Sequence, residues 1–264
     1  MSDFGIYFDL DGVLADYSTG IERKGFKVDR SVKLDLNRSG TGHPLKREMY
    51  ELIRGTDFYE TLPIMPGAVA MFRAALALDP SPAILTAAPK FGAGEDDFHE
   101  NAFWRGAAYH KRRWVEEVFL PQVHPTVVRG WGPGATREVT PSRYPISDLD
   151  FICVTSASKR KFVHHKHGAR QVLIDDRIDN VRAWAEAGGC GLLHVDPILT
   201  LKGLEELKTL EDRLTSGWVA HGTGKLWSET AVPCKRCGAE VDENCEGDLD
   251  TCPRFTKGDQ HEPA

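Results

Sequence analysis

Acidic side chains follow two apolar segments of the sequence, and their types suit phosphate chemistry. Asp9 and Asp11 end the first apolar segment, and Asp175 and Asp176 end a later one. Carboxylates gathered at one point repel one another unless a cation lies among them, and a purely oxygen ligand set favours Mg²⁺. When a metal neutralises a phosphate group, one carboxylate can attack phosphorus while a second protonates the leaving oxygen and later activates water.

The alternative is that these acids are loop residues that cap helices. A single aspartate at the end of a strand could simply be such a helix cap. The four acids, together with Thr86 at the end of a further apolar segment, form an ordered set that capping alone does not explain. We therefore expect a cation-dependent acidic site.

These residues need a scaffold that brings distant segments together. Five short, nearly continuous apolar runs predict strands buried on both faces, and helical patterns lie between them. This alternation indicates an α/β fold with a doubly wound parallel sheet, in which sites form beyond the carboxyl ends of the strands. The predicted strands are residues 5–9, 83–86, 151–155, 171–176 and 190–195, and the predicted helices are residues 67–78, 109–120, 179–187 and 199–214.

The remaining segments set the expected domain organisation. We expect a main domain over residues 1–215, a linker over 216–228 and a cysteine-rich tail over 229–264. Residues 17–65 are polar and mixed, and residues 126–149 are rich in Gly, Pro, Ser and Thr. We assign no structure to the second of these stretches.

The segment FDLDGVLAD (residues 8–16) resembles the first motif of the haloacid dehalogenase (HAD) phosphohydrolase superfamily. Within it, the chain is similar to the 5′(3′)-deoxyribonucleotidase branch, and the resemblance covers roughly residues 4–196. It implies a HAD-like Rossmannoid fold and an aspartate-dependent phosphatase activity. The supporting segments are residues 58–59, 62–68, 85–90, 111–119 and 173–180.

The resemblance implies a role for each matching residue. Asp9 would be the nucleophile that forms an aspartyl-phosphate, and Asp11 would be the general acid and base whose backbone carbonyl reaches Mg²⁺. Asp175 would ligate Mg²⁺, with Asp176 as a further ligand or an acid just outside the ligand set. Thr86 would hydrogen-bond the phosphoryl oxygens.

A lysine is needed to neutralise the charge of the aspartate and the phosphate, and three candidates remain. Lys159 follows the third predicted strand, where the family has this lysine, and ranks first. Lys111 matches a helix lysine that faces phosphate in the deoxyribonucleotidases, and Lys161 ranks third; each could instead be a solvated surface charge. Ala87 departs from the family, which has a serine there, and one phosphate contact is lost with it.

Residues 17–65 occupy the position where HAD proteins carry a cap. We expect a small helical cap there that closes over the site and excludes water. Its aromatic side chains are candidates for stacking a nucleobase, although in a small cap they can instead form its core. The candidate substrate-binding residues are Phe58, Tyr59, Ala87, Lys90 and Arg177, with Phe26 and Tyr50 as further aromatic candidates.

The tail over residues 229–264 differs from the rest of the chain in charge and cysteine content. It holds nine acidic and four basic side chains, net −5, out of −6 for the whole chain. Four cysteines in a short polar segment suit a structural tetrahedral Zn²⁺, whose binding would supply the folding energy of the tail. Disulfides are the alternative. The expected zinc ligands are Cys234, Cys237, Cys245 and Cys252.

Two histidine-containing alternatives exist for a zinc site. His261 could replace Cys252 as the fourth ligand. A run of three histidines, His164, His165 and His167, is a rival metal site that we interpret as a solvated loop. The acidity of the tail disfavours contact with phosphate, so a protein partner, a second subunit or the cap is its more plausible contact.

Composition narrows the class of protein. The chain has 264 residues, 41% of them hydrophobic, which is ample for a folded core and unlike a disordered chain. Its net acidity argues against general coating of nucleic acid. We find no export signal at the N-terminus and no apolar run of the ~18 residues that a membrane span needs. We therefore expect a cytoplasmic protein with reduced thiols, in which Cys153 and Cys190 are buried strand residues.

We expect a Mg²⁺-dependent phosphatase that hydrolyses nucleoside monophosphates, with the 5′ or 3′ position and a preference for deoxyribonucleotides left open. The alternative is a HAD phosphatase acting on the phosphate ends of nucleic acids or on another small phosphate ester, with the zinc tail aiding binding. A binding or scaffolding protein with a vestigial site is a third hypothesis. The intact set of Asp9, Asp11, Thr86 and Asp175 argues against it.

Overall fold

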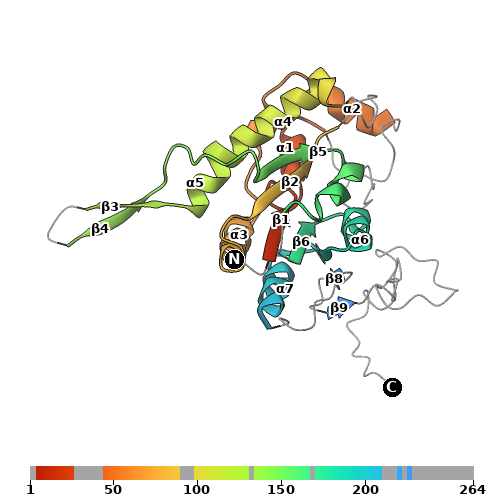
Figure 1. Cartoon of the computed structure of the whole chain (residues 1–264). Coiled ribbons are helices and arrows are strands. Elements are labelled where there is room, and N and C mark those ends of the chain that lie inside the picture. Colours follow the sequence, from red (N-terminus) through yellow and green to blue (C-terminus); the bar gives the residue numbers. More distant parts are fainter. Residues whose placement is uncertain are drawn as a thin grey trace, which may run out of the picture.

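A mostly parallel sheet forms the centre of the protein (Figure 1). The computed structural model describes residues 4–26, 44–89, 98–130, 134–166, 170–209, 219–221 and 225–227. Within them the sheet has seven strands in the order β5-β2-β1-β6-β7-β8-β9, all parallel to their neighbours except β9, which is antiparallel to β8. The strands are β1 (Phe4–Phe8), β2 (Ala83–Ala87), β5 (Phe151–Val154), β6 (Arg170–Asp175), β7 (Cys190–Leu193), β8 (Val219–His221) and β9 (Lys225–Trp227).

The central strand β1 is buried on both faces because its apolar residues alternate between two separate cores. Successive side chains of a strand point to opposite faces. Ile6 and Phe8 pack into one core, where the Phe8 ring lies 5.2 Å from that of Phe72. Tyr7 packs into the other core, 5.1 Å from the ring of Trp184. This double burial explains the continuous apolar run in the sequence.

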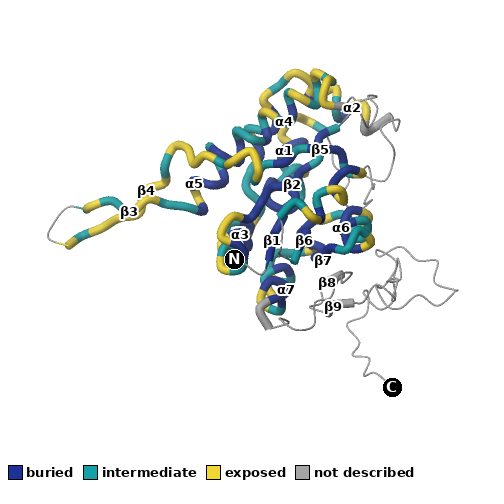
Figure 2. Tube along the Cα trace, viewed as in Figure 1, coloured by how far each residue is buried: buried dark blue, intermediate teal, exposed yellow. Residues whose placement is uncertain are grey.

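Helices cover both faces of the sheet, so the predicted doubly wound arrangement of parallel strands is confirmed. On the first face lie α3 (Ala68–Leu76), α4 (Ala102–Trp114) and α7 (Pro197–Thr209), which contribute to the larger core. On the second face lie the 3-10 helix η4 (Ser156–Phe162) and α6 (Ile178–Glu186), which supplies Trp184. Figure 2 shows the buried residues concentrated along the strands between these layers.

The strand order reverses direction at β1. The chain runs from β1 to β2 and β5 on one side, then returns to β6 and β7 on the other side of β1. The connections after β1 and β6 therefore diverge at the carboxyl ends of adjacent strands. In open α/β sheets, ligands bind at this switch point.

The long helix that carries Lys111 begins earlier than predicted. α4 starts at Ala102 rather than near residue 109, because Asn101 accepts hydrogen bonds from the backbone N–H groups of Phe103 and Trp104 and caps the helix. It continues into a π-helical turn, Val115–Phe119, and the short helix α5, Leu120–Val123. Pro121 cannot donate a helical hydrogen bond and its ring crowds the preceding turn, which accounts for the wider turn.

A two-stranded arm, β3 (Thr126–Arg129) and β4 (Thr136–Val139), projects from the end of α5 (Figures 1 and 2). The strands are antiparallel, and almost all of their residues are exposed. This arm occupies the first part of the stretch over residues 126–149, to which the sequence assigned no structure. An exposed hairpin has no core-facing side, so it lacks the apolar alternation that marks a strand.

The described part of residues 17–65 contains α1 (Tyr17–Arg23), α2 (Pro44–Ile53) and the 3-10 helix η1 (Phe58–Thr61). A further 3-10 helix, η2, spans Phe98–Glu100, just before α4. Within the expected linker over residues 216–228, the described residues 219–221 and 225–227 form β8 and β9, which pair beside β7. The cysteine-rich tail lies outside the described residues. Within the described part, no helix is both long and apolar enough to cross a membrane.

Candidate active site

Asp9 stands at the switch point, directly after β1. Its backbone N–H still donates to the carbonyl of Ile174 on β6 (2.8 Å), which holds the residue in line with the strand. Its Oδ1 atom accepts hydrogen bonds from the backbone N–H of Leu10 (2.7 Å) and from the ammonium of Lys159 (2.9 Å). The buried carboxylate is therefore fixed through one oxygen, and its Oδ2 atom is left for a ligand.

A tight turn follows Asp9 and brings Asp11 back over the sheet. Gly12 has a φ of 82°, which glycine adopts without a steric penalty. Its N–H donates to the carbonyl of Ala15 (2.9 Å) and closes the turn. A Cβ atom at this position would lie 2.5 Å from Oδ2 of Asp176. The absence of a side chain at Gly12 thus allows the turn and the Asp176 carboxylate to pack together.

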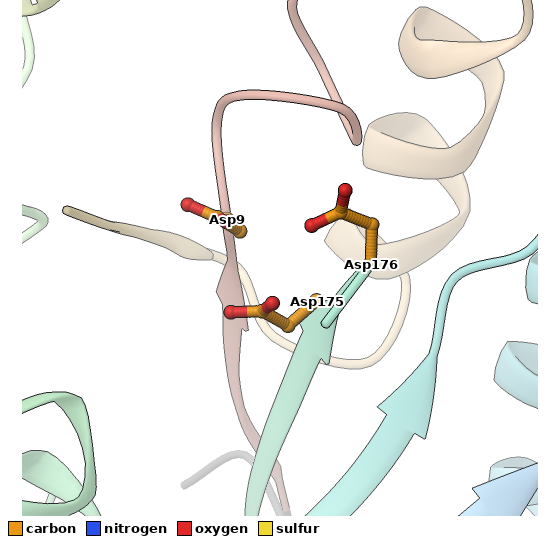
Figure 3. Close-up of side chains that lie close together, drawn as sticks. All are labelled: Asp9, Asp175 and Asp176. Carbon is orange, nitrogen blue, oxygen red and sulfur yellow. The ribbon is translucent and has the colours of Figure 1, made fainter. Parts of the chain in front are cut away.

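Three carboxylates gather at the ends of β1 and β6 (Figure 3). Asp9, Asp175 and Asp176 each offer one oxygen, and these oxygens lie within 4.8 Å of one another. Asp9 and Asp175 are buried, whereas Asp176 is exposed to solvent. None of the three caps a helix. Helix capping after β1 belongs to Asp16, which accepts from the N–H of Thr19 at the start of α1.

Asp175 is held in place by the start of α6. Its Oδ1 accepts from the backbone N–H of Arg177 (2.9 Å), and Nδ2 of Asn180 reaches both of its oxygens, at 3.1 and 2.9 Å. Asn180 was assigned no role of its own from the sequence. Its position five residues after an aspartate at a strand end, in the first turn of the next helix, is the signal that could have identified it.

Lys159 bridges the two buried carboxylates. Its ammonium lies 2.9 Å from Oδ1 of Asp9 and 2.7 Å from Oδ2 of Asp175. Burial alone would lower the pKa of Lys159, but the charges of Asp175 and Asp9 outweigh it and raise that pKa above its usual value. The lysine is therefore a permanent cation between the two carboxylates.

Lys111 approaches the site from α4, on the opposite side of the turn. Its fully buried ammonium donates to Oδ2 of Asp11 (2.7 Å), Oγ1 of Thr86 (3.0 Å) and the carbonyl of Ala87 (2.5 Å). It also lies 4.9 Å from the centre of the Tyr59 ring. The structure therefore brings both Lys159 and Lys111 into the site.

Two acids of the site, Asp175 and Asp176, have raised pKa values, chiefly because of burial. Burial raises the pKa of Asp175, and the charge of Asp9 adds to it while Lys159 opposes it. Although Asp176 is open to solvent on one side, enclosure of its carboxyl group and the charges of Asp175 and Asp9 raise its pKa well above the usual value. The cluster carries more negative charge than Lys159 alone can compensate.

Asp11 differs from the other acids in its partners. Enclosure raises the pKa of Asp11, an effect that Lys111 opposes and the charge of Asp9 reinforces. Only its Oδ2 atom is bonded; the buried Oδ1 atom has no hydrogen-bond partner among the described residues. A carboxyl group with a raised pKa and an unbonded oxygen is suited to donating a proton.

Aromatic side chains from residues 17–65 pack beside Asp11. Phe58 is fully buried, with its ring 5.1 Å from Tyr59 and 5.3 Å from Tyr17, and belongs to the hydrophobic core. Phe58 thus takes the core role that was the alternative for the aromatic residues of this segment, and stacking of a base on it stays a prediction. Tyr59, also buried, lies against Lys111, and Tyr17 was not singled out in the sequence.

The other predicted residues lie at varying distances from this cluster. Arg177 donates from its guanidinium to Oγ of Ser156, beside the Lys159 helix. Lys161 and His164 are exposed, and His165 contacts the carbonyl of Leu149. Outside the described residues lie Lys90, His167, His261 and the four tail cysteines. Burial raises the pKa of Cys153 and of Cys190 to about 12.

Comparisons with known proteins add a distant similarity to solved structures. The sequence matches no protein-family model and no curated protein. Among solved structures, the chain is similar to one described as a haloacid dehalogenase-like hydrolase from Burkholderia xenovorans LB400. The two share 13% identity with a TM-score of 0.37, covering 73% of this chain and 82% of that chain. Similarity at this level assigns no family, so the function is argued from the site itself.

Proposed function

We propose that the chain is a Mg²⁺-dependent phosphatase of the HAD type that hydrolyses phosphate monoesters through an aspartyl-phosphate on Asp9. The observation that carries the proposal is the placement of Asp9. It lies at the switch point of the sheet with one oxygen fixed by Lys159 and with Asp175 and Asp176 within ligand distance. On the other side, Asp11 lies on a turn that returns toward the same point.

The residues at this point fit a magnesium ion. The available donors are all carboxylate oxygens, which a hard cation prefers. Asp176 makes no hydrogen bond within the described residues and is open to solvent, as a ligand that completes its coordination with an ion would be. Burial raises the pKa values of Asp175 and Asp176, the charge of Asp9 adds to both, and a cation nearby would lower them. Bound Mg²⁺ would supply charge neutralisation of the phosphate and of the attacking carboxylate.

The side chains divide the chemical work between them. Oδ2 of Asp9 attacks phosphorus, while the Lys159 ammonium holds Oδ1 of Asp9 and offsets the repulsion between this carboxylate and the phosphate. Asp11 donates a proton to the leaving oxygen and, once deprotonated, accepts one from the water that hydrolyses the aspartyl-phosphate. Thr86 and Lys111 offer a hydroxyl and an ammonium to the phosphoryl oxygens from the neighbouring strand and helix.

Nucleoside monophosphates are the substrates that we propose. The support is the aromatic wall beside Asp11, on the side where the leaving group must lie because Asp11 protonates its oxygen. The half-buried Tyr17 and Tyr50 make this wall both apolar and polar, as a nucleoside requires. A small sugar phosphate or a phosphorylated nucleic-acid end is the alternative, which a substrate panel separates.

Phosphate release tests the proposal. The test compares the wild type with Asp9→Asn and with the control Asp57→Asn, which changes an exposed aspartate outside the site. The substrates are p-nitrophenyl phosphate, ribo- and deoxyribonucleoside 5′- and 3′-monophosphates, sugar phosphates and 3′-phosphorylated oligonucleotides. Each assay is run with and without Mg²⁺. We expect Mg²⁺-dependent release by the wild type and the control, and none by Asp9→Asn. Turnover retained in Asp9→Asn would rule out Asp9 as the nucleophile. A wild-type protein that releases phosphate from none of the esters would contradict the phosphatase function.

We also propose that the tail binds structural Zn²⁺, on the sequence spacing of its four cysteines alone. The catalytic residues described above are complete without it. Chelation of zinc under excess Mg²⁺ should therefore leave phosphate release intact while removing one zinc per chain, measured by elemental analysis. Loss of activity on chelation would make the tail part of the site. The cytoplasmic location and a protein partner for the tail remain proposals of the same kind.

A further inference from the structure

Two buried oxygen atoms beside the candidate catalytic acid lack hydrogen-bond partners within the described residues. They are Oδ1 of Asp11 and the hydroxyl oxygen of Tyr17. Asp11 is accounted for by its proposed role, since a group that transfers a proton needs an unbonded oxygen. The Tyr17 hydroxyl has no place in that chemistry and needs a separate explanation.

The backbone and ring of Tyr17 are firmly placed. Its N–H donates to the carbonyl of Ala15 (3.0 Å), which ties the start of α1 to the turn that carries Asp11. Its ring meets Phe58 edge-on at 5.3 Å and lies 6.4 Å from the ring of Tyr59. The position of the hydroxyl therefore follows from packing and is not a free rotation of an exposed side chain.

The same packing places Tyr17 next to the reacting groups. Tyr59, which its ring adjoins, carries the Lys111 ammonium over its face, and that ammonium bonds Asp11. Burial raises the pKa of Tyr17 well above its usual value, and the neighbouring Tyr50 and Asp11 add to that rise. Tyr17 therefore lies near the proposed proton donor, Asp11.

A buried hydroxyl without a partner costs free energy, and proteins rarely keep one unless a ligand or an ordered water completes it. Phenylalanine would fill the same ring position without this cost. A hydroxyl retained beside the leaving-group side of the site is therefore best explained by a polar atom of the substrate. An apolar leaving group would leave the Tyr17 hydroxyl buried without a hydrogen-bond partner. Sites with such a buried polar group discriminate strongly against substrates that cannot pair with it.

We propose that Tyr17 is a specificity-determining residue whose hydroxyl hydrogen-bonds an oxygen of the leaving group, so that the substrates are phosphate esters of hydroxyl-bearing alcohols such as nucleosides or sugars. This inference rests on the proposed phosphatase function. It adds the requirement that the leaving group carry a further hydroxyl, which phosphate-ester hydrolysis itself does not need. The ester p-nitrophenyl phosphate lacks this feature, because p-nitrophenol has no hydroxyl besides its leaving oxygen. The two kinds of ester therefore separate the role of Tyr17 from that of the catalytic groups.

The test compares Tyr17→Phe with the wild type and with Tyr109→Phe, which removes the hydroxyl of an exposed tyrosine on α4. Values of kcat/KM are measured for p-nitrophenyl phosphate and for the best nucleoside monophosphate or sugar phosphate. For Tyr17→Phe we expect a loss of about tenfold with the hydroxyl-bearing ester and a change within about twofold with p-nitrophenyl phosphate. Tyr109→Phe should change neither.

Thermal unfolding of the free protein supplies a second readout. If the hydroxyl has no partner in the protein, Tyr17→Phe should melt at the same temperature as the wild type or higher. A lower melting temperature would show that the hydroxyl bonds the protein and would overturn the inference. So would equal losses with both esters, or no loss with either.

The result also separates this inference from the proposed function. A wild-type protein that releases phosphate from neither ester contradicts the phosphatase itself. One that hydrolyses p-nitrophenyl phosphate but no hydroxyl-bearing ester leaves the phosphatase standing and removes the role of Tyr17.

Discussion

The ammonium of Lys159 lies 2.9 Å from Oδ1 of Asp9, and this pair is buried at the carboxyl end of the central strand. The lysine comes from η4, which follows β5 at one edge of the sheet, and the aspartate follows β1. The same ammonium bonds Asp175 at the end of β6. One cation therefore joins three segments of the chain and holds the proposed nucleophile in position.

Replacing Lys159 by methionine should reduce both stability and activity. The buried carboxylates of Asp9 and Asp175 would lose their cation, and breaking such a pair costs about 3–5 kcal/mol. Because the pKa of Lys159 is raised in the folded protein, its stabilising contribution is complete at neutral pH and is lost only as the pH rises through that raised value. Urea unfolding at pH 7 measures the stability and phosphate release measures the activity.

Lys161→Met is the control for this change. Lys161 lies two residues further along and is exposed, so its loss should alter the free energy of unfolding by less than about 0.5 kcal/mol. If the two variants behave alike, the buried bridge has no special role.

The sequence predicted the elements that bury apolar residues. The runs at residues 5–9, 83–86 and 171–176 are strands of the parallel sheet because each is buried on both faces, and continuous burial leaves a continuous apolar signature. The arm of β3 and β4 is exposed and lies outside that core. Its pairing depends on backbone hydrogen bonds, which sequence patterns do not record.

The partners of the two lysines could not be read from the sequence. Lys111 and Asp11 are 100 residues apart, and the pattern of a helix does not say which strand end its lysine reaches. Lys159 could be ranked first only through the resemblance, because it follows the third predicted strand, where the resembled family has this lysine. The Tyr17 hydroxyl shows the same limit, since a missing partner is a property of the folded structure.

Removing Lys111 should change the pH dependence of catalysis. Its charge opposes the rise in the pKa of Asp11, so in Lys111→Met that pKa should rise further. Asp11 would then stay protonated to higher pH, and the alkaline limb of the kcat profile should move to higher pH as kcat falls. Lys111→Arg keeps the charge and should move the limb less. An unchanged limb in Lys111→Met would remove Asp11 as the proton donor.

Magnesium should stabilise the folded protein through Asp176. At a concentration 100 times its Kd, a ligand of the folded state adds about 2.7 kcal/mol, which corresponds to a rise in Tm on the order of 5–10 °C for a domain of this size. Asp176→Asn should weaken Mg²⁺ binding at least about tenfold. Asp179→Asn, an exposed acid on α6, is the control and should keep the full shift.

The magnesium effect should also depend on pH. The pKa values of Asp175 and Asp176 are raised without metal, so protons compete with Mg²⁺ for these carboxylates as the pH falls. The rise in Tm with Mg²⁺ should therefore be smaller at pH 5 than at pH 7. A shift that is equal at both values would place the bound metal elsewhere.

Gly12→Ala should disturb the site through a steric contact. Gly25→Ala is the control that separates this contact from backbone strain. The new Cβ would lie 2.5 Å from Oδ2 of Asp176, and the φ of 82° adds backbone strain of about 1–3 kcal/mol. Gly25 has a φ of 89°, but nothing lies within 4 Å of its Cβ position. Gly25→Ala should therefore show the strain alone and keep full activity. If Gly12→Ala also keeps its activity and its Mg²⁺ binding, the position of Asp176 does not matter.

Glu116→Gln should loosen the base of the arm without touching the site. The buried carboxylate of Glu116 accepts from Nε of Arg112 (3.2 Å) and from Nε of Arg143 (3.0 Å), which holds the chain returning from β4 against α4. Losing a buried carboxylate between two guanidinium groups costs about 3–5 kcal/mol by analogy with other buried ion pairs. Glu117→Gln, whose carboxylate pairs with Arg113 at the surface, should cost less than about 0.5 kcal/mol.

The pH dependence of that difference identifies its cause. Burial alone would raise the pKa of Glu116, but the hydrogen bonds from Arg143 and Arg112 outweigh it and leave the pKa lowered. A lowered pKa gives a stabilising contribution that is present above the pKa of the unfolded chain and is lost as the pH falls through that of the folded chain. The gap between wild type and Glu116→Gln should thus be full at pH 7 and shrink below pH 4. A gap that persists at acid pH would mean that packing, rather than the charge of Glu116, anchors the arm.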